Sequence, residues 1–334
     1  SKKDEKKVPV LDIALYDQKM LALANIPPPP APKIATGTSK VATGTVPNTN
    51  TQKIATGTKP YPWPTKTPYP KPGALFPFNR ILAYYGNFYS TKMGVLGQYP
   101  KDVMLEKLMA EKANWEAADP TTPVIPAIHY IAVTAQGSPQ KDGTYRLRMP
   151  DSQIDHALTL AEEIKGVVFL DIQVGLSTVQ KEVPLLEKYL KMPNVHLGLD
   201  PEFAMTISGK KPGSVIGTMT AADINYAINY LAKLVRDNNL PPKVLVIHRF
   251  TKGMVLGYKD ITPLPEVQVV MDMDGWGFGA KKINTYNTVI YPEPVQFTGF
   301  KLFYKNDLLP PSTRMLTPKE VLGLSPRPIY IQYQ

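Results

Sequence analysis

The sequence predicts an α/β protein, a (β/α)8 barrel of the TIM type preceded by an extended low-complexity N-terminal segment. Between residues 80 and 334, eight apolar strand-like segments alternate with helix-like segments, and roughly 250 residues is the usual size of such a barrel. An open doubly wound sheet is the alternative. No glycine-rich phosphate loop follows the first strand, which counts against a dinucleotide-binding sheet of that kind.

The composition suits a soluble globular protein. The chain has 334 residues, of which 43% are hydrophobic, and no run of about 18 apolar residues predicts a transmembrane helix. Cysteine is absent, so disulfides, thiolate nucleophiles and thiolate metal sites are excluded. The sequence starts at Ser1 without Met and without the apolar region of a signal peptide, as expected of a mature or trimmed form.

Residues 1–79 form the predicted N-terminal segment. They contain 11 Lys and 4 acidic residues, which is +7 of the total net charge of +10, and leave +3 for the remainder. The repeats IATGT, VATGT and IATGT start at residues 34, 41 and 54, before a stretch of alternating prolines and aromatics at 61–72. This composition is typical of an extended spacer. The alternative is that Tyr61, Trp63 and Tyr69 hold the segment against the domain.

The charge of this segment indicates its partners. A basic tail favours an anionic surface polymer or a membrane surface, although a solvated tail has the same composition. The near-neutral remainder shows no basic groove signature, so nucleic acid is not expected as a partner. A weakly amphipathic helix is predicted over 8–25, and Pro27 to Pro30 end it because proline cannot continue a helix.

The barrel elements follow in order. The predicted strands cover 81–88, 124–133, 167–173, 195–202, 243–250, 267–274, 297–304 and 329–333. The predicted helices cover 101–118, 151–164, 179–191, 220–237 and 280–291, with a short one starting at 317. Asp151 is predicted to cap its helix, and Thr220 with Asp223 forms a capping-box pattern. Residues 134–149 are expected to form a polar loop.

Polar residues stand at the ends of these strands, where a (β/α)8 barrel carries its active site. Side chains alternate along a strand, so every second residue points inward. The inward set is Tyr85 and Asn87 on the first strand, His129 on the second, Asp171 and Gln173 on the third, Asp200 and Glu202 on the fourth, His248 on the fifth, Asp272 and Asp274 on the sixth, and Lys301 on the seventh. Tyr84 points inward instead if the parity of the first strand is reversed.

The candidate catalytic residues are five carboxylates on three strands, namely Glu202, Asp200, Asp171, Asp272 and Asp274. Crowded like charges raise at least one pKa, which keeps a carboxyl protonated for use as a general acid. Glycoside hydrolysis uses such a pair of carboxyls. We expect Glu202 to be the acid, Asp200 to orient it or the substrate, and Asp171 or Asp272 to be the base or stabiliser.

Two alternatives stay open. The first is a metal-dependent hydrolase, for example of phosphoesters, because Asp171, Asp200, Asp272, Asp274 and His248 could bind a hard divalent ion. The second is a non-catalytic carbohydrate-binding or structural surface protein, since a fold does not prove a function. No HExxH motif is present, which disfavours zinc. The glycoside hydrolase interpretation needs no cofactor and no metal.

Aromatic residues near the strand ends favour a sugar ligand. Trp276 follows Asp274 by two residues, and flat rings offer apolar faces to pyranose rings, although aromatics also fill barrel rims. The expected ligand is a polysaccharide or cell-wall glycan. The expected substrate-binding residues are Tyr85, Asn87, His129, Gln173, His248, Trp276 and Lys301.

Two resemblances add to this interpretation. Asp200-x-Glu202 resembles the end of the D-x-x-D-x-D-x-E motif of family 18 glycoside hydrolases, and residues 271–274 (MDMD) resemble that family's M-x-Y-D, with Val195, Gly198 and Met273 at the differing positions. This likeness implies that the Glu is the acid in a substrate-assisted reaction.

The second resemblance covers most of residues 80–334. The segments YGN (85–87), GVLG (94–97), LDPEF (199–203) and FKLFY (300–304) are similar to a group of uncharacterised secreted bacterial lipoproteins with a Pro/Thr-rich spacer before the barrel. That likeness implies an extracytoplasmic protein, secreted or anchored at the cell surface, with a lipid-bearing Cys ahead of Ser1.

Overall fold

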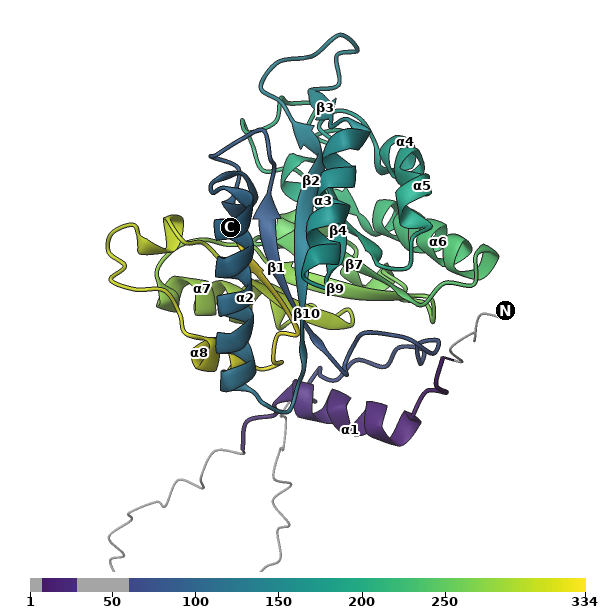
Figure 1. Cartoon of the computed structure of the whole chain (residues 1–334), viewed down its shortest axis with the longest axis vertical. Coiled ribbons are helices and arrows are strands. Elements are labelled where there is room, and N and C mark those ends of the chain that lie inside the picture. Colours follow the sequence, from purple (N-terminus) through teal and green to yellow (C-terminus); the bar gives the residue numbers. More distant parts are fainter. Residues whose placement is uncertain (1–7, 29–59) are drawn as a thin grey trace, which may run out of the picture.

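The computed structural model describes residues 8–28 and 60–334, and it confirms the predicted (β/α)8 barrel (Figure 1). The barrel strands are β1 (Arg80–Gly86), β2 (Val124–Ala135), β4 (Val167–Ile172), β5 (Val195–Leu199), β7 (Lys243–Arg249), β9 (Val267–Met273), β10 (Phe297–Leu302) and β11 (Tyr330–Tyr333). Neighbouring barrel strands pair in parallel, and β1 pairs with both β2 and β11, so the sheet closes on itself.

Three short strands lie outside the barrel. β3 (Arg146–Arg148) pairs antiparallel with the end of β2, so the expected polar loop at 134–149 was wrong in part. Its residues form a hairpin because β2 continues through Thr134 and Ala135, beyond the predicted end of that strand at Val133. β6 (Met219–Thr220) and β8 (Val255–Leu256) form a separate two-stranded sheet.

Helices follow the strands and cover the outside of the barrel (Figure 1). They are α2 (Lys101–Ala118), α3 (Asp151–Glu163), α4 (Val179–Glu182), α5 (Glu187–Leu190), α6 (Ala221–Asp237), α7 (Gly279–Thr285) and α8 (Pro318–Leu322). The capping box of Thr220 and Asp223 forms as predicted. The predicted cap at Asp151 was wrong, because Pro150 takes the N-cap position and Asp151 instead pairs with Lys188.

The predicted helix at 179–191 is interrupted. A 3-10 turn at Val183–Leu186 separates α4 from α5, and it contains Pro184, which lacks the N–H that an α-helix interior needs. The helix predicted at 280–291 changes after Thr285 into a π-helical turn, Tyr286–Ile290. Both departures are local and leave the order of strands unchanged.

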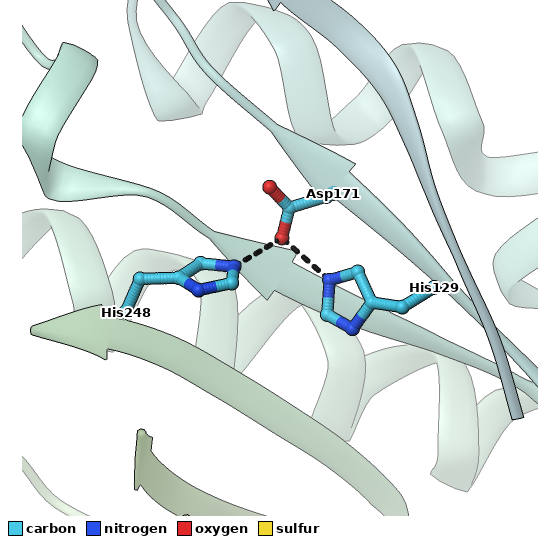
Figure 2. A group of neighbouring side chains, drawn as sticks. All are labelled: His129, Asp171 and His248. Atoms are coloured by element: carbon cyan, nitrogen blue, oxygen red, sulfur yellow. Dashed lines mark hydrogen bonds and ion pairs between the residues drawn. The ribbon is translucent and has the colours of Figure 1, made fainter. Parts of the chain in front are cut away.

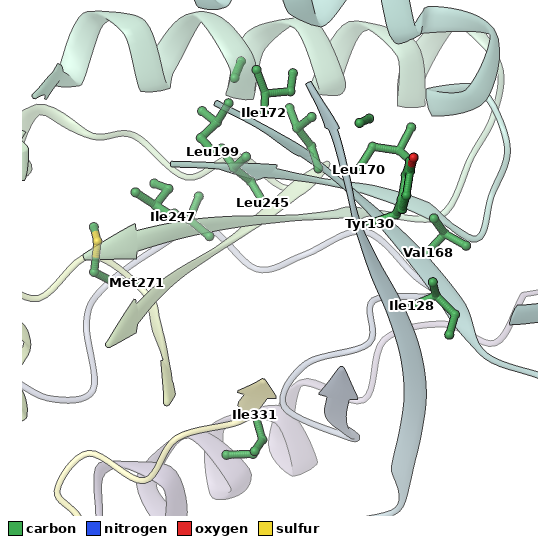
Figure 3. Close-up of a cluster of buried hydrophobic side chains, with 14 of the residues drawn as sticks. Ile128, Tyr130, Val168, Leu170, Ile172, Leu199, Leu245, Ile247, Met271 and Ile331 are labelled. Atoms are coloured by element: carbon green, nitrogen blue, oxygen red, sulfur yellow. The ribbon is translucent and has the colours of Figure 1, made fainter. Parts of the chain in front are cut away.

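The core has two parts, because alternate side chains of each strand point to opposite faces. Apolar side chains on the outward face pack under the helices, and Figure 3 shows part of this cluster. Its labelled members are Ile128, Tyr130, Val168, Leu170, Ile172, Leu199, Leu245, Ile247, Met271 and Ile331. Toward the N-terminal ends of the strands the inward face is apolar, and residues such as Ile81, Ala127 and Phe169 pack together there.

Helix α1 (Ile13–Ala24) closes the base of the barrel, at the N-terminal ends of the strands (Figure 1). Tyr16 and Met20 pack in the same cluster as Phe76, Ile81 and Ile329. The helix begins at Asp12, whose side chain accepts a 2.9 Å hydrogen bond from the Leu15 N–H, the usual role of an N-cap aspartate.

Residues 60–79 also contact the domain, as the alternative for Tyr61, Trp63 and Tyr69 proposed. Trp63 is buried and donates from Nε1 to the Tyr291 carbonyl at 3.0 Å. The Tyr61 hydroxyl donates to the Ala24 carbonyl at 3.2 Å, and the Tyr69 hydroxyl donates to Asp17 at 3.0 Å. Residues 1–7 and the three repeats lie outside the described residues. The division of the chain near residue 80 stays a prediction.

Within residues 8–28 and 60–334, no helix has both the length and the apolar character needed to cross a bilayer.

Candidate active site at the barrel mouth

A cavity of about 630 Å³ opens where the barrel strands end. It is lined by residues from the strand ends and the loops that follow them: Tyr85, Lys92, Met93, Ile131, Ala135, Gln173, Asp200, Glu202, Phe203, Phe250, Asp274, Gly275, Trp276, Lys281, Thr285, Lys301, Phe303, Asn306 and Gln334. Seven of the predicted site residues are in this lining. Four others, His129, Asp171, His248 and Asp272, are fully buried and outside the lining.

The two predicted residues that end the fourth barrel strand are held by a local turn. β5 ends at Leu199, earlier than predicted, because Asp200 caps a 3-10 turn over Pro201–Phe203. The Glu202 N–H donates to Asp200 Oδ1 at 3.1 Å, so the Asp200 side chain fixes the backbone that carries Glu202. Asp200 is buried, whereas Glu202 is half-buried and reaches the cavity.

Three carboxyls meet at the cavity. One oxygen each from Asp200, Glu202 and Asp274 lies within 4.8 Å of the other two. Asp274 is also bound by cations, because Lys301 Nζ lies 2.9 Å from its Oδ1 and His248 Nδ1 lies 3.3 Å from its Oδ2. Three of the five predicted carboxylates therefore meet at the cavity, and one of the three is paired with basic groups.

These environments push the pKa values apart. Burial, and then the charge of Asp274, raise the pKa of Glu202 to about 7. Burial also raises the pKa of Asp200 well above its ordinary value. Burial alone would raise the pKa of Asp274, but Lys301 and His248 outweigh it, and the net pKa is below the ordinary value. Glu202 thus keeps its proton up to about pH 7 while Asp274 is ionised, which is the division that acid–base chemistry needs.

A buried polar group supports these carboxyls (Figure 2). Asp171 Oδ1 accepts a 2.7 Å bond from His129 Nε2 and a 2.8 Å bond from His248 Nε2. His129 Nδ1 then accepts from the Tyr330 hydroxyl at 2.6 Å, which makes His129 the neutral Nε2–H tautomer. His248 is charged, because Asp171 and Asp274 raise its pKa well above the ordinary value although burial opposes them.

Glycines make room for the buried carboxylates. A Cβ at Gly198 would lie 2.1 Å from Asp171 Oδ1, and one at Gly299 would lie 2.6 Å from Asp272 Oδ1. Neither glycine has the positive φ that glycine is usually needed for. Both are required by the space that a neighbouring strand's Asp occupies, since real side chains do not approach so closely.

Asp272 is fully buried, and neither of its oxygens has a hydrogen-bond partner among the described residues, unlike the buried Asp171 and Asp200, which each accept at least one hydrogen bond. Burial raises the pKa of Asp272 to about 7. Its nearest basic atom is His248 Nδ1, 3.7 Å from Oδ2. A carboxyl in such surroundings is stable only while it is protonated.

Replacement of Asp272 by Asn should therefore stabilise the protein at high pH. The folded state keeps the Asp272 proton up to about pH 7, whereas the unfolded chain loses it near pH 4. Wild-type stability consequently falls as the pH rises between these values, by at most about 4 kcal/mol from this group. Urea denaturation at pH 4, 6 and 8 should show an advantage of Asp272→Asn that grows with pH. The exposed Asp260→Asn is the control, and an equal advantage of Asp272→Asn at all three pH values would contradict the prediction.

The first barrel strand and the loop after it place three of the discussed residues differently. Asn87 lies outside the cavity lining, where its amide donates to the Tyr130 hydroxyl at 3.3 Å and to the Ile131 carbonyl at 3.0 Å. Tyr85 points inward as predicted, with its ring beside His129 and His248. Tyr84 points outward, and its hydroxyl lies 2.7 Å from that of Tyr304.

Other residues near the site were missed. Tyr330 and Gln332 join the buried polar group from β11, where Gln332 Nε2 donates to the Tyr330 hydroxyl at 2.8 Å. Their alternation along the last strand could have revealed them. Lys92 and Phe250 line the cavity from loops, where no periodic pattern marks the residues, and Lys281 lines it from helix α7.

Two groups of side chains are close enough to share a cation. They are His129, Asp171 and His248, and Asp200, Glu202 and Asp274. In the first group both imidazole Nε2 atoms already donate to one Asp171 oxygen. In the second, Asp274 is paired with Lys301 and Glu202 keeps its proton up to about pH 7. In the first group Asp171 Oδ2 has no hydrogen-bond partner among the described residues, but a single free carboxylate oxygen is far fewer than the roughly six oxygen ligands that a hard divalent cation takes.

Comparison with known proteins adds little to these observations. No family model matches the sequence, and no curated protein matches it. Among solved structures, the chain is similar to a trimodular GH5 subfamily 4 endoglucanase, at 10% identity and a TM-score of 0.41, over 78% of this chain and 56% of that one. It is also similar to a tri-modular GH5 endo-β-1,4-glucanase from Bacillus licheniformis complexed with cellotetraose, at 10% identity and a TM-score of 0.39, over 78% and 54%.

A third similar structure is that of the HPPK-DHPS of Plasmodium falciparum with pteroate, at 10% identity and a TM-score of 0.34, over 76% of this chain and 44% of that one. The chain thus spans little more than half the length of the two endoglucanases. Likeness at these scores carries no argument about activity.

Proposed function

We propose that this barrel is a glycoside hydrolase, with Glu202 as the general acid and Asp274 as the ionised carboxylate on the other side of the bond. The observation that carries the proposal is the Glu202–Asp274 pair. The two carboxyls line one cavity, their oxygens lie within 4.8 Å, and their pKa values are shifted in opposite directions.

The separation favours a retaining reaction. Retaining enzymes hold their two carboxyls about 5–5.5 Å apart, whereas inverting enzymes leave about 6.5–9.5 Å for a water molecule. Asp274 would then attack the anomeric carbon while Glu202 protonates the leaving oxygen, and Glu202 would later deprotonate the attacking water. Asp274 takes the role expected of Asp171 or Asp272, since both of those are buried below the cavity.

The support for a sugar ligand is the lining of the cavity. Trp276 is 47% exposed beside it, and Phe203, Phe250 and Phe303 add apolar faces. Lys301 Nζ lies 3.9 Å from the centroid of the Tyr85 ring, so the inner wall is both aromatic and charged. Such rings with a few polar groups suit pyranose rings.

The experiment that tests the proposal is hydrolysis of defined oligosaccharides, with cello-, xylo-, chito- and galacturonate oligomers as the panel. New reducing ends should form on one class, and proton NMR of the first product should show retained anomeric configuration. The chito-oligomers also test the substrate-assisted route that the family 18 resemblance implies. Binding without a product on every class would support the non-catalytic alternative, and hydrolysis of phosphoesters abolished by EDTA would support the metal-dependent one.

The pH profile of the reaction should report Glu202. The protonated form of Glu202 is the active one, so kcat/KM should fall about tenfold per pH unit above a pKa of about 7. The acidic side of the profile should extend below the ordinary range of Asp, because the pKa of Asp274 is lowered. Activity that stays constant up to pH 9 would contradict the assignment of Glu202 as the acid.

The location and the partners of the N-terminal segment stay predictions. An extracytoplasmic barrel, and a basic segment that binds an anionic polymer or a membrane surface, rest on the lipoprotein resemblance and on the charge of residues 1–79. A cell-wall glycan as the substrate would agree with both.

A further inference from the structure

The charges at the cavity do not balance. Asp274 is paired with Lys301 at 2.9 Å. Asp200 and Glu202, the other two carboxyls of the group, have raised pKa values because they are buried. The acidic side chains of the site are therefore paired or partly protonated near neutral pH.

Three lysines remain around the opening. Lys92 and Lys281 line the main cavity, and Lys305 lines a second hollow of about 70 Å³ that shares Lys92, Phe303, Asn306 and Gln334 with the first. All three lysines are exposed. In the part of the chain that the structure describes, none of them has an acidic side-chain oxygen within 4.0 Å, whereas Lys301 does.

The three lysines lie along the two hollows, where a ligand made of several sugar units would bind. The two hollows share part of their lining and therefore lie side by side, and we call them together the groove. Lys281 Nζ lies 4.8 Å from the centroid of the Trp276 ring, so an ammonium stands beside an aromatic face. A sugar ring that packs on Trp276 would bring its substituents close to this ammonium.

We propose that the ligand of this groove is an anionic glycan, and that Lys92, Lys281 and Lys305 bind its carboxylate or phosphate substituents. The proposal rests on the proposed function, because it assumes that the cavity binds a glycan. Ammonium groups without an acidic partner attract anions and raise their local concentration in a cleft. A neutral glycan would leave these three charges unused.

Binding can be measured at the site itself, in the full-length chain. Trp276 is exposed, whereas Trp63 and Trp115, the other two of the three tryptophans, are buried. The indole N–H of Trp276, assigned with Trp276→Phe, thus reports on the groove and not on the basic N-terminal segment. The probes are trigalacturonic acid for carboxylate, a glycerol phosphate trimer for phosphate, and cellotriose and tri-N-acetylchitotriose as neutral sugars.

At least one anionic probe should bind about tenfold or more tightly than both neutral sugars, and raising the salt concentration should weaken it. The triple variant Lys92→Gln, Lys281→Gln, Lys305→Gln should lose about 10- to 100-fold in affinity for that probe. Its matched control changes three other exposed lysines, Lys181, Lys259 and Lys319, to Gln, with the same change in net charge. The control should bind like the wild type.

Several outcomes would overturn the proposal. They are equal or tighter binding of the neutral sugars, no binding of either anionic probe, salt-independent binding, or equal losses in the two triple variants. The salt series uses only wild-type protein, so it decides the matter even if the triple variant does not fold. Hydrolysis confined to neutral glycans would overturn this inference and leave the proposed function intact. Tight binding of an anionic probe without hydrolysis of any glycan would do the reverse.

Discussion

Replacing Glu202 by Gln is expected to reduce turnover by about 10²–10⁴-fold, the usual contribution of general acid catalysis. Gln keeps the size of the side chain and removes the proton that Glu202 holds because of its raised pKa. Oligosaccharide binding and the thermal midpoint should change little, since the Glu202 backbone N–H, and not its carboxyl, makes the bond to Asp200. Turnover and affinity are to be measured separately, by product formation and by calorimetry.

Two controls separate the acid from a merely structural residue. Glu162→Gln makes the same chemical change at an exposed position on α3 and should leave turnover unchanged. A dinitrophenyl glycoside needs almost no protonation of its leaving group, so Glu202→Gln should lose far less activity on it than on the natural linkage. Equal losses on both substrates would contradict the role of proton donor, and unimpaired hydrolysis by the variant would end the assignment.

Replacing Gly198 by Ala should destabilise the fold by about 3 kcal/mol, or roughly 6–12 °C in the thermal midpoint. The new methyl carbon would lie 2.1 Å from Asp171 Oδ1 and 2.7 Å from His129 Nε2. Asp171 cannot move away without breaking its bonds to His129 and His248, and neither can the strand that carries Gly198. Thermal denaturation followed by circular dichroism measures the effect.

Gly137→Ala is the matched control, because a Cβ at residue 137 would meet no atom within 4 Å. It should change the midpoint by no more than a degree or two. The cause of the destabilisation can be tested in an Asp171→Ala background, where the clashing carboxylate is gone. Gly198→Ala should then cost clearly less than in the wild type, and an additive cost would show that the steric conflict lies elsewhere.

The fold was predictable because its signals are local. Each barrel strand is a short apolar run, because a closed parallel sheet buries both faces of its strands. Such a strand is recognised in the sequence by an unbroken run of apolar residues and not by alternation of apolar and polar ones. The helix at 101–118 was predicted to the residue, and the strand ends were wrong by a few residues where polar caps intervene. At Asp200 the chain turns because its side chain accepts the Glu202 N–H, a local hydrogen bond that strand periodicity does not reveal.

The candidate site was predictable only in part. Parity placed Asp200, Glu202 and Asp274 at one mouth, and the structure brings them together there. The alternation of side chains along a strand does not show how deep each residue lies in the barrel. It therefore could not predict that Asp171 and Asp272 lie buried below the cavity that the other three carboxyls line. That depth depends on the stagger of neighbouring strands and on Gly198 and Gly299, which admit the carboxylates across the barrel. Such complementarity joins residues far apart in the sequence, and a single chain gives no local signal for it.

The contacts at the base of the barrel fix where residues 28 and 60 lie relative to the cavity. The Tyr61 hydroxyl bonds to the Ala24 carbonyl, so the chain departs after residue 28 and re-enters at residue 60 on the same side, at the end of the barrel opposite the cavity (Figure 1). A bead or a surface attached at residue 28 or at residue 60 would therefore meet the barrel at its floor. The opening of the cavity lies at the other end of the strands and would stay clear of the point of attachment.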